Sequence, residues 1–311
     1  MTRVTAPSRL HFGLLNVPTA GSPREERRFG GIGLMIDQPG TIVSVQPADT
    51  WRFEGPLASR AQVFAHRLLA STGLPIPPLQ VLVKRCPEEH AGLGVGTQLG
   101  LAVAKAIAVE SGLSVLDATD LAVLIDRGER SAVGVHGFDR GGLIVEPGKR
   151  ESESLSPLLS CIRLPEDWRV AVFVPRGGPS WHGSQEEGAF ANATSTGLTA
   201  SLCDLALREL LPAAAAGDLP AFGEAVHHFN RRAGLPFAAA QGGEYSSPEV
   251  AETIARIRAL GVPCAGQSSW GPAVFAIVPD ANRAERLLKQ LSSVRGWIAK
   301  VSEGHILDRG E

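Results

Sequence analysis

The sequence has few cysteines, and no two of them are close together in the chain. Its four cysteines, Cys86, Cys161, Cys203 and Cys264, are widely separated in a chain of 311 residues, and no two have CxxC spacing. The spacing indicates neither a zinc site nor a redox motif. We therefore expect isolated, mostly buried thiols in a reducing cytosol.

The chain also lacks a charge excess and a long apolar run. The formal net charge is −2, which argues against a general nucleic-acid binder. No apolar run approaches the length of a membrane span, and residues 1–13 contain no apolar segment of the signal-peptide kind. These features predict a cytoplasmic protein that binds neither nucleic acid nor membrane.

The most informative feature of the sequence is a glycine-rich segment. Residues 90–108, HAGLGVGTQLGLAVAKAIA, follow a strand-like stretch and run into an apolar helix. The segment has neither the Gly-Lys-Ser/Thr of a P-loop nor G-x-G-x-x-G after a first strand. Glycines allow positive φ, and the amides at a helix start attract anions. The segment therefore favours a phosphate site, and the alternative is a glycine turn needed only for packing.

Strand-like and helix-like stretches alternate along the chain and predict an α+β fold. A polar stretch at 151–156 suggests a boundary between two domains, 1–160 and 161–311. In the first domain, Asp117 is expected to cap a helix over 117–130. The other helices are expected at 56–73, 97–110, 196–211, 218–232, 248–260 and 281–293. The strands are expected at 2–6, 9–15, 41–48, 78–86, 141–148, 168–175, 271–280 and 297–303.

Three segments resemble, in order, the three motifs of the GHMP kinase superfamily. They are APSRLHFGLLN (6–16), HAGLGVGTQLGLAVA (90–104) and GQSSWGPAVFAIV (266–278). The resemblance implies a GHMP kinase-like two-domain fold, with an N-terminal domain like S5 domain 2 and a ferredoxin-like C-terminal domain. It also implies that the glycine segment is the phosphate loop.

The motifs depart from those of a kinase in two places. Gly96-Thr97-Gln98 replaces the usual paired serines, and no carboxylate lies about seven residues before Gly141-Gly142. The segments RFGGIGLMID (28–37), GLGVGTQL, RSAVGVHGFDRGGLIVEPG (130–148) and GQSSWGP are instead similar to those of the beta-ribofuranosylaminobenzene 5'-phosphate (beta-RFAP) synthases, a family within the superfamily.

That resemblance implies an enzyme that transfers a ribosyl group. The family condenses phosphoribosyl pyrophosphate (PRPP) with 4-aminobenzoate and releases pyrophosphate and CO2, in the first committed step of methanopterin biosynthesis. The sequence leaves 4-hydroxybenzoate open as the acceptor. The resemblance further implies Mg²⁺ as cofactor and a homodimer. Two alternatives remain, an ATP-dependent small-molecule kinase and a non-catalytic ligand-binding member of the superfamily.

Several residues are candidates for the site. Gly94, Gly96, Thr97 and Gln98 are expected to cradle pyrophosphate, with Mg²⁺ bridging phosphate oxygens. Arg9 and His11 share one face of a strand and could contact the 5'-phosphate or the benzoate carboxylate. The alternative for this pair is a surface arginine and a packed histidine.

The resemblance adds candidates from other segments. His136 and Asp139 are candidates for a proton carrier or metal contact, beside Arg9 and His11 as catalytic residues. Arg130 could contact a phosphate, and the alternative is a cation placed favourably at a helix C-terminus. His182 could belong to a lid over the substrate, and the alternative is a solvated surface loop. The further candidates for substrate binding are Gly30, Gly31, Gly92, Ser131, Gln267, Ser268 and Ser269.

Overall fold

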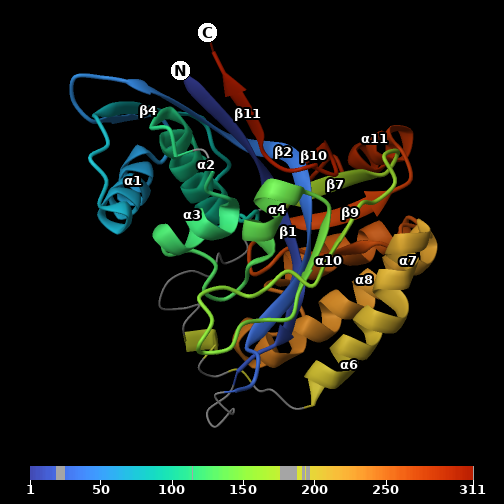
Figure 1. Ribbon diagram of the computed structural model, residues 1–311. Helices are drawn as coiled ribbons and strands as arrows, with labels where there is room; N and C mark the ends of the chain where they lie inside the picture. The colour runs from blue at the N-terminus through green and yellow to red at the C-terminus, as the bar shows by residue number, and fades with distance from the viewer. Residues whose placement is uncertain (19–24, 114, 176–187, 191–192, 194–196, 311) are drawn as a thin grey trace.

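Two β-sheets organise the chain. The computed structural model describes residues 1–18, 25–113, 115–175, 188–190, 193 and 197–310. The first sheet has seven strands in the order β11-β1-β2-β4-β3, with β5 paired to β2 and β6 paired to β5. The second has four, in the order β10-β7-β9-β8. Helices surround both sheets, which confirms the α+β class (Figure 1).

The two longest strands run antiparallel through the centre of the molecule (Figure 1). They are β1 (Thr2–Asn16) and β2 (Phe29–Pro47). The stretches expected as separate strands over 2–6 and 9–15 therefore form one strand. The register shifts at Pro7, which has no N–H to donate to the ladder and lies opposite residues 37–40 of β2. The strand continues past this bulge, since its apolar side chains on both faces are buried.

Four helices pack beside the first sheet and carry part of the site. They are α1 (Ala58–Thr72), α2 (Val95–Glu110), α3 (Ala118–Leu124) and α4 (Val133–Arg140). Most of α2 is buried, because small residues such as Gly100 let α1 approach closely. Asp117 caps α3 through a reciprocal capping box, as expected.

The helix expected over 117–130 is shorter than predicted. It ends at Leu124, because Asp126 and Gly128 both adopt left-handed backbone conformations, with φ of 59° and 87°. These turns direct residues 126–131 away from the helix axis. The loop they form becomes one wall of the site.

The second sheet packs between two helical layers. Helices α10 (Pro248–Ala259) and α11 (Ala281–Gln290) cover one face, and α8 (Leu219–Gly234) shares a core with the other face and with β1. The remaining strands are β3 (Arg52–Glu54), β4 (Leu79–Arg85), β5 (Leu143–Glu146), β6 (Ser160–Ile162), β7 (Arg169–Val174), β8 (Ala265–Gln267), β9 (Val274–Val278), β10 (Arg295–Lys300) and β11 (Ile306–Arg309). The remaining helices are α6 (Leu198–Leu205), η1 (Ala206–Leu210), α7 (Leu211–Ala216), η2 (Leu235–Phe237) and α9 (Ala238–Gln241).

The end of the chain returns to the first sheet. Strand β11 pairs antiparallel with residues 2–5 of β1, so the two termini lie close together (Figure 1). Strand β6 also joins this sheet from beyond residue 160. The proposed boundary between residues 160 and 161 stays a prediction. None of the helices in the described ranges is both long and apolar enough to cross a membrane.

Candidate functional site

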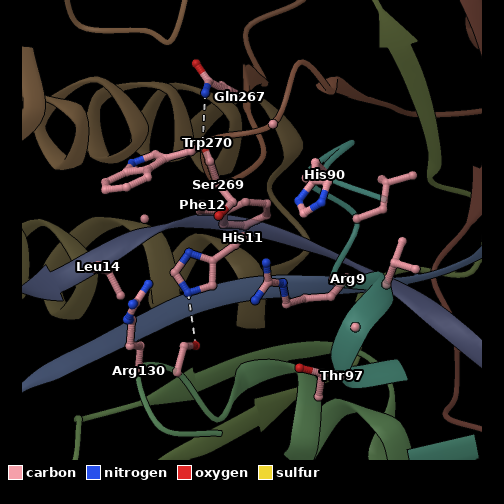
Figure 2. A pocket seen from close by; sticks show the side chains of 18 of the residues that line it. Arg9, His11, Phe12, Leu14, His90, Thr97, Arg130, Gln267, Ser269 and Trp270 are labelled. Carbon is pink, nitrogen blue, oxygen red and sulfur yellow. Dashed lines mark hydrogen bonds between the residues drawn. The ribbon is translucent and has the colours of Figure 1, made fainter. Parts of the chain in front are cut away.

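One cavity of about 500 Å³ lies where the glycine segment meets β1. Its walls come mainly from β1, residues 89–97, the loop 126–131 and the loop 267–271, and Arg60, Phe190 and part of the stretch 230–245 complete them. Figure 2 shows Arg9 and His11 projecting from the same strand into this space, as their alternation predicted. The three segments that carry the resemblance therefore meet at one place.

The glycine segment begins α2 at the edge of the cavity. Gly94 adopts φ of 71° and precedes the helix without any side-chain cap. The first helical amides are thus not capped by a side chain, and they lie at the positive end of the helix dipole. Arg9 runs alongside, since a Cβ on Gly94 would lie 3.0 Å from Arg9 Cβ. Gly94, Gly96 and Thr97, three of the four residues expected to cradle pyrophosphate, line the cavity.

Two arginines that the sequence did not single out also line this end. Arg60 comes from α1 and Arg127 from the loop after α3. Arg60 forms an ion pair with Glu89, and Arg127 Nη2 donates a hydrogen bond to Thr97 Oγ1 at 3.3 Å. Neither lies in a recognisable motif, so only the fold brings them to the glycine segment.

His11 is buried at the centre of the cavity wall. Its Nε2 lies 3.1 Å from Ser131 Oγ, which brings two predicted residues together (Figure 2). Burial, and secondarily the charge of Arg9, holds the pKa of His11 well below its ordinary value. The imidazole is therefore neutral near pH 7. Gly31 lies directly against it, because a Cβ there would be 2.7 Å from Nε2.

Glu146 is a buried carboxylate behind this pair that the sequence reading missed. It is fully buried on β5 and accepts a hydrogen bond from the Ala132 N–H at 3.0 Å. Burial raises its pKa, and the neighbouring Ser156 and Ser131 side chains partly offset this effect. The only sign of this residue in the sequence is a glutamate at the end of the apolar stretch LIVE. All four residues of this strand are buried, so the carboxylate has no exposed face of the sheet to occupy.

Aromatic side chains form the opposite end of the cavity. Phe190, Phe237 and Trp270 pack together, with ring centroids 4.5 to 5.4 Å apart. Arg130 stacks on this group, with its Cζ 4.8 Å from the Phe190 ring centroid. Trp270 belongs to the GQSSWGP segment, so a closer reading of that motif could have found it.

Six predicted residues within the described ranges line no part of the cavity: Gln98, Ser268, His136, Asp139, Gly30 and Gly31. Gln98 is buried and donates from Nε2 to the Gly134 carbonyl at 2.7 Å. Ser268 accepts from the His11 N–H at 3.0 Å and donates to the Gly92 carbonyl at 2.6 Å. His136 and Asp139 lie on α4, pointing elsewhere: His136 Nε2 is 2.8 Å from the Ser156 carbonyl.

Asp139 has a structural environment. It accepts from the Ala118 N–H at 2.8 Å and pairs with His305 at 3.3 Å. Despite partial burial, these partners lower the pKa of Asp139, so the carboxylate stays ionised. It therefore holds the chain end and α3 against α4 rather than facing the cavity.

The remaining candidates divide between the cavity and its frame. Gly92, Arg130, Gln267 and Ser269 line the cavity, while Gly30 packs against the Pro147 backbone with φ of 62°. His182 lies outside the described residues. The sequence analysis thus named residues from most of the segments that line the cavity, but it did not separate residues that line it from residues that lie behind the wall.

The structure also places the position at which kinases of the superfamily often carry an aspartate. Gly134 lies seven residues before Gly141, and a Cβ on it would be 3.6 Å from both Arg9 Cδ and Thr97 Cγ2. The position thus adjoins the residues of the phosphate end but has no side chain. Within the described residues, no group of three His, Cys, Asp or Glu side chains forms a metal site.

Comparisons with known proteins agree with this arrangement. The model of the family "GHMP kinases C terminal" matches residues 210–294. Solved structures share the fold: homoserine kinase from Cytophaga hutchinsonii has a TM-score of 0.69 at 13% identity, covering 99% of this chain and 97% of that one. Phosphomevalonate kinase from Streptococcus pneumoniae has a TM-score of 0.69 at 15% identity, covering 96% and 99%. The chain therefore shares the fold of these kinases, and its residues 210–294 match the C-terminal domain of GHMP kinases.

Curated relatives identify the family more closely. The beta-ribofuranosylphenol 5'-phosphate synthase of Methanothermobacter thermautotrophicus is 30% identical over 301 residues, covering 89% of this chain and 88% of the relative. The protein of the same name from Archaeoglobus fulgidus is 28% identical, covering 100% and 98%. The chain belongs to the beta-ribofuranosylphenol 5'-phosphate synthase family and is an enzyme.

Proposed function

We propose that this enzyme joins the ribosyl group of PRPP to 4-aminobenzoate or 4-hydroxybenzoate, with release of pyrophosphate and CO2. One observation carries the proposal: a single cavity has an anion-binding end, formed by the α2 N-terminus and arginines, and an aromatic end formed by Phe190, Phe237 and Trp270. The two ends suit the two substrates.

The proposed reaction needs no separate base. The C1–O bond of PRPP breaks, and its electron pair leaves with pyrophosphate. The ring carbon that carries the carboxylate attacks C1, and the para amino or hydroxyl group supplies electron density. The bond to the carboxylate then breaks, CO2 leaves, and the pair restores aromaticity. Atoms and charge balance without a proton transfer, in keeping with the lack of a side chain at Gly134.

The residues of the chain would bind, orient and exclude water. The amides of Val95 and Gly96 and the hydroxyl of Thr97 would hold the leaving pyrophosphate. Arg9 carries a permanent charge beside the glycine segment and would bind a phosphate or the carboxylate. His11 is neutral at this place and would act as a hydrogen-bonding group rather than a cation.

Mg²⁺ fits this cavity as a partner of the substrate. Glu89, Asp126 and Glu129 line the cavity, but Glu89 is engaged with Arg60 and Asp126 with Arg67. Such scattered carboxylates suit an ion that takes most of its oxygens from phosphate groups and water. Bound there, Mg²⁺ would neutralise part of the charge of the pyrophosphate.

The identity of the acceptor, the pathway and the assembly are part of the proposal. The names of the relatives specify a ribofuranosylphenol product, which supports a hydroxyl rather than an amino group on the ring. Either product would start methanopterin biosynthesis. We also propose that the enzyme acts in the cytoplasm as a homodimer.

Incubation with PRPP, Mg²⁺ and carboxyl-labelled acceptor tests the function. We expect labelled CO2 to be released in equal amount with pyrophosphate, from one or both acceptors. Thr97→Ala should lower this turnover. ATP consumption with homoserine, mevalonate or a sugar, and no requirement for PRPP, would instead establish a kinase. PRPP binding without release of pyrophosphate or CO2 would indicate a non-catalytic ligand-binding protein.

A further inference from the structure

Two guanidinium groups converge on one small residue at the start of α2. A Cβ on Gly96 would lie 2.6 Å from Arg60 Nη2 and 3.3 Å from Arg127 Nη2. The two arginines come from different elements, α1 and the loop that follows α3. Both line the cavity, so their charged ends meet at its glycine-segment end.

Specific contacts hold each arginine in place. The guanidinium of Arg127 lies 6.0 Å from the ring centroid of Phe64 on α1, and it donates to Thr97 Oγ1. Arg60 is half-buried and pairs with Glu89, just beyond β4. Burial lowers the pKa of Arg60 but leaves the guanidinium charged. The pair is thus built into the fold rather than extended into solvent.

The electrostatics of this cluster favour an added anion. Two cations and the positive end of the α2 dipole lie together, and Glu89 is the carboxylate seen to pair with Arg60 there. Like charges at such spacing disfavour one another unless an anion bridges them. Guanidinium groups match phosphate oxygens in a bidentate manner, so a diphosphate is the ligand class that this geometry suits.

Glycine at position 96 leaves room for the two guanidinium groups. The motif of the superfamily has a serine in this part of the loop, and a side chain at Gly96 would displace the end of the Arg60 side chain from its present position. A fixed pair of guanidinium groups occupies the space that a serine side chain would take.

We propose that Arg60 and Arg127 bind the diphosphate of the substrate and of the released pyrophosphate. This inference rests on the proposed function for the identity of the ligand. Each arginine contributes charged hydrogen bonds to the phosphate oxygens, and Glu89 keeps Arg60 oriented toward them.

Direct binding of inorganic pyrophosphate, measured by calorimetry with Mg²⁺ present, tests the inference. Arg60→Ala and Arg127→Ala should each weaken the affinity about ten- to a hundredfold, because each removes charged hydrogen bonds. Arg127→Lys keeps the charge but loses the planar fork, so its affinity should fall between those of the wild type and the alanine variant. Arg52→Ala is the matched control, since Arg52 is an exposed arginine on β3 that does not line the cavity.

The readouts separate this inference from the proposed function. Wild-type affinity in both alanine variants, or no pyrophosphate binding by the wild type, would overturn the role of the arginines. If the variants bind normally while the wild type releases CO2 from PRPP and acceptor, the reaction stands and the arginine assignment fails. If the arginines bind pyrophosphate but the wild type releases no CO2, the assignment stands and the reaction fails. If Arg127→Ala fails to fold, Arg60→Ala and Arg127→Lys provide the measurement.

Discussion

Replacing Gly31 with alanine tests whether the position of the His11 imidazole controls turnover. Gly31 lies on β2 beside β1, and a Cβ there would be 2.7 Å from His11 Nε2 and 3.1 Å from its Cε1. Nε2 is also hydrogen-bonded to Ser131 Oγ at 3.1 Å. The new methyl group must therefore push the ring away from Ser131 or shift the two strands.

The expected cost in stability is moderate. Overpacking a buried site costs about 1–3 kcal/mol, and loss of one hydrogen bond adds about 1 kcal/mol. Gly31 does not have a positive φ, so alanine brings no backbone strain. The effect on turnover should be larger, because misplacing a group in the site by about 1 Å can cost roughly a hundredfold.

Gly137→Ala provides the matched control. A Cβ there would lie 2.3 Å from Met35 Sδ, in a buried cluster that does not line the cavity. Both variants should lose stability in thermal unfolding, but only Gly31→Ala should lose kcat/KM for CO2 release. Wild-type turnover by Gly31→Ala would refute the reasoning, and an equal loss in both variants would show a general effect of destabilisation.

Three further predictions concern charge and exposure. Burial lowers the pKa of His11, so below pH 6.5, its ordinary pKa, the unfolded chain binds more protons than the folded chain, and the free energy of unfolding should fall as pH falls. Urea titrations across this range should show a weaker pH dependence of the free energy of unfolding for His11→Gln than for the wild type. The same pH dependence in both proteins would contradict this prediction. Burial raises the pKa of Glu146, so its ionisation should lower the free energy of unfolding as pH rises through the ordinary carboxyl range. The same urea titrations should therefore show a larger free energy of unfolding for Glu146→Gln than for the wild type at neutral pH. A smaller value would mean that the charge of Glu146 is compensated in the folded protein. Cys161 and Cys203 are exposed, whereas Cys264 is buried and burial raises its pKa to about 12. A thiol reagent should therefore modify Cys161 and Cys203 in the native protein and Cys264 only after unfolding. Mass spectrometry of the labelled peptides would show which thiols have reacted.

Much of the fold could be predicted from local patterns. The strand over 78–86, the helix that follows the glycines and the cap at Asp117 all appear, because each depends on neighbouring residues. The helix expected over 117–130 was too long, since periodicity does not reveal left-handed turns at Asp126 and at Gly128. The return of β11 to β1 is a pairing across the whole chain, which no local window contains.

The sequence by itself determined the class of site: a glycine segment at a helix start, the face shared by Arg9 and His11, and motifs that match one family. Tertiary structure decided which side chains meet. It brought Arg60 and Arg127 to Gly96, and it set Glu146 behind His11. It also turned His136 and Asp139 away from the cavity. The reason is physical: a motif is read along the backbone, whereas contact depends on packing between elements distant in sequence.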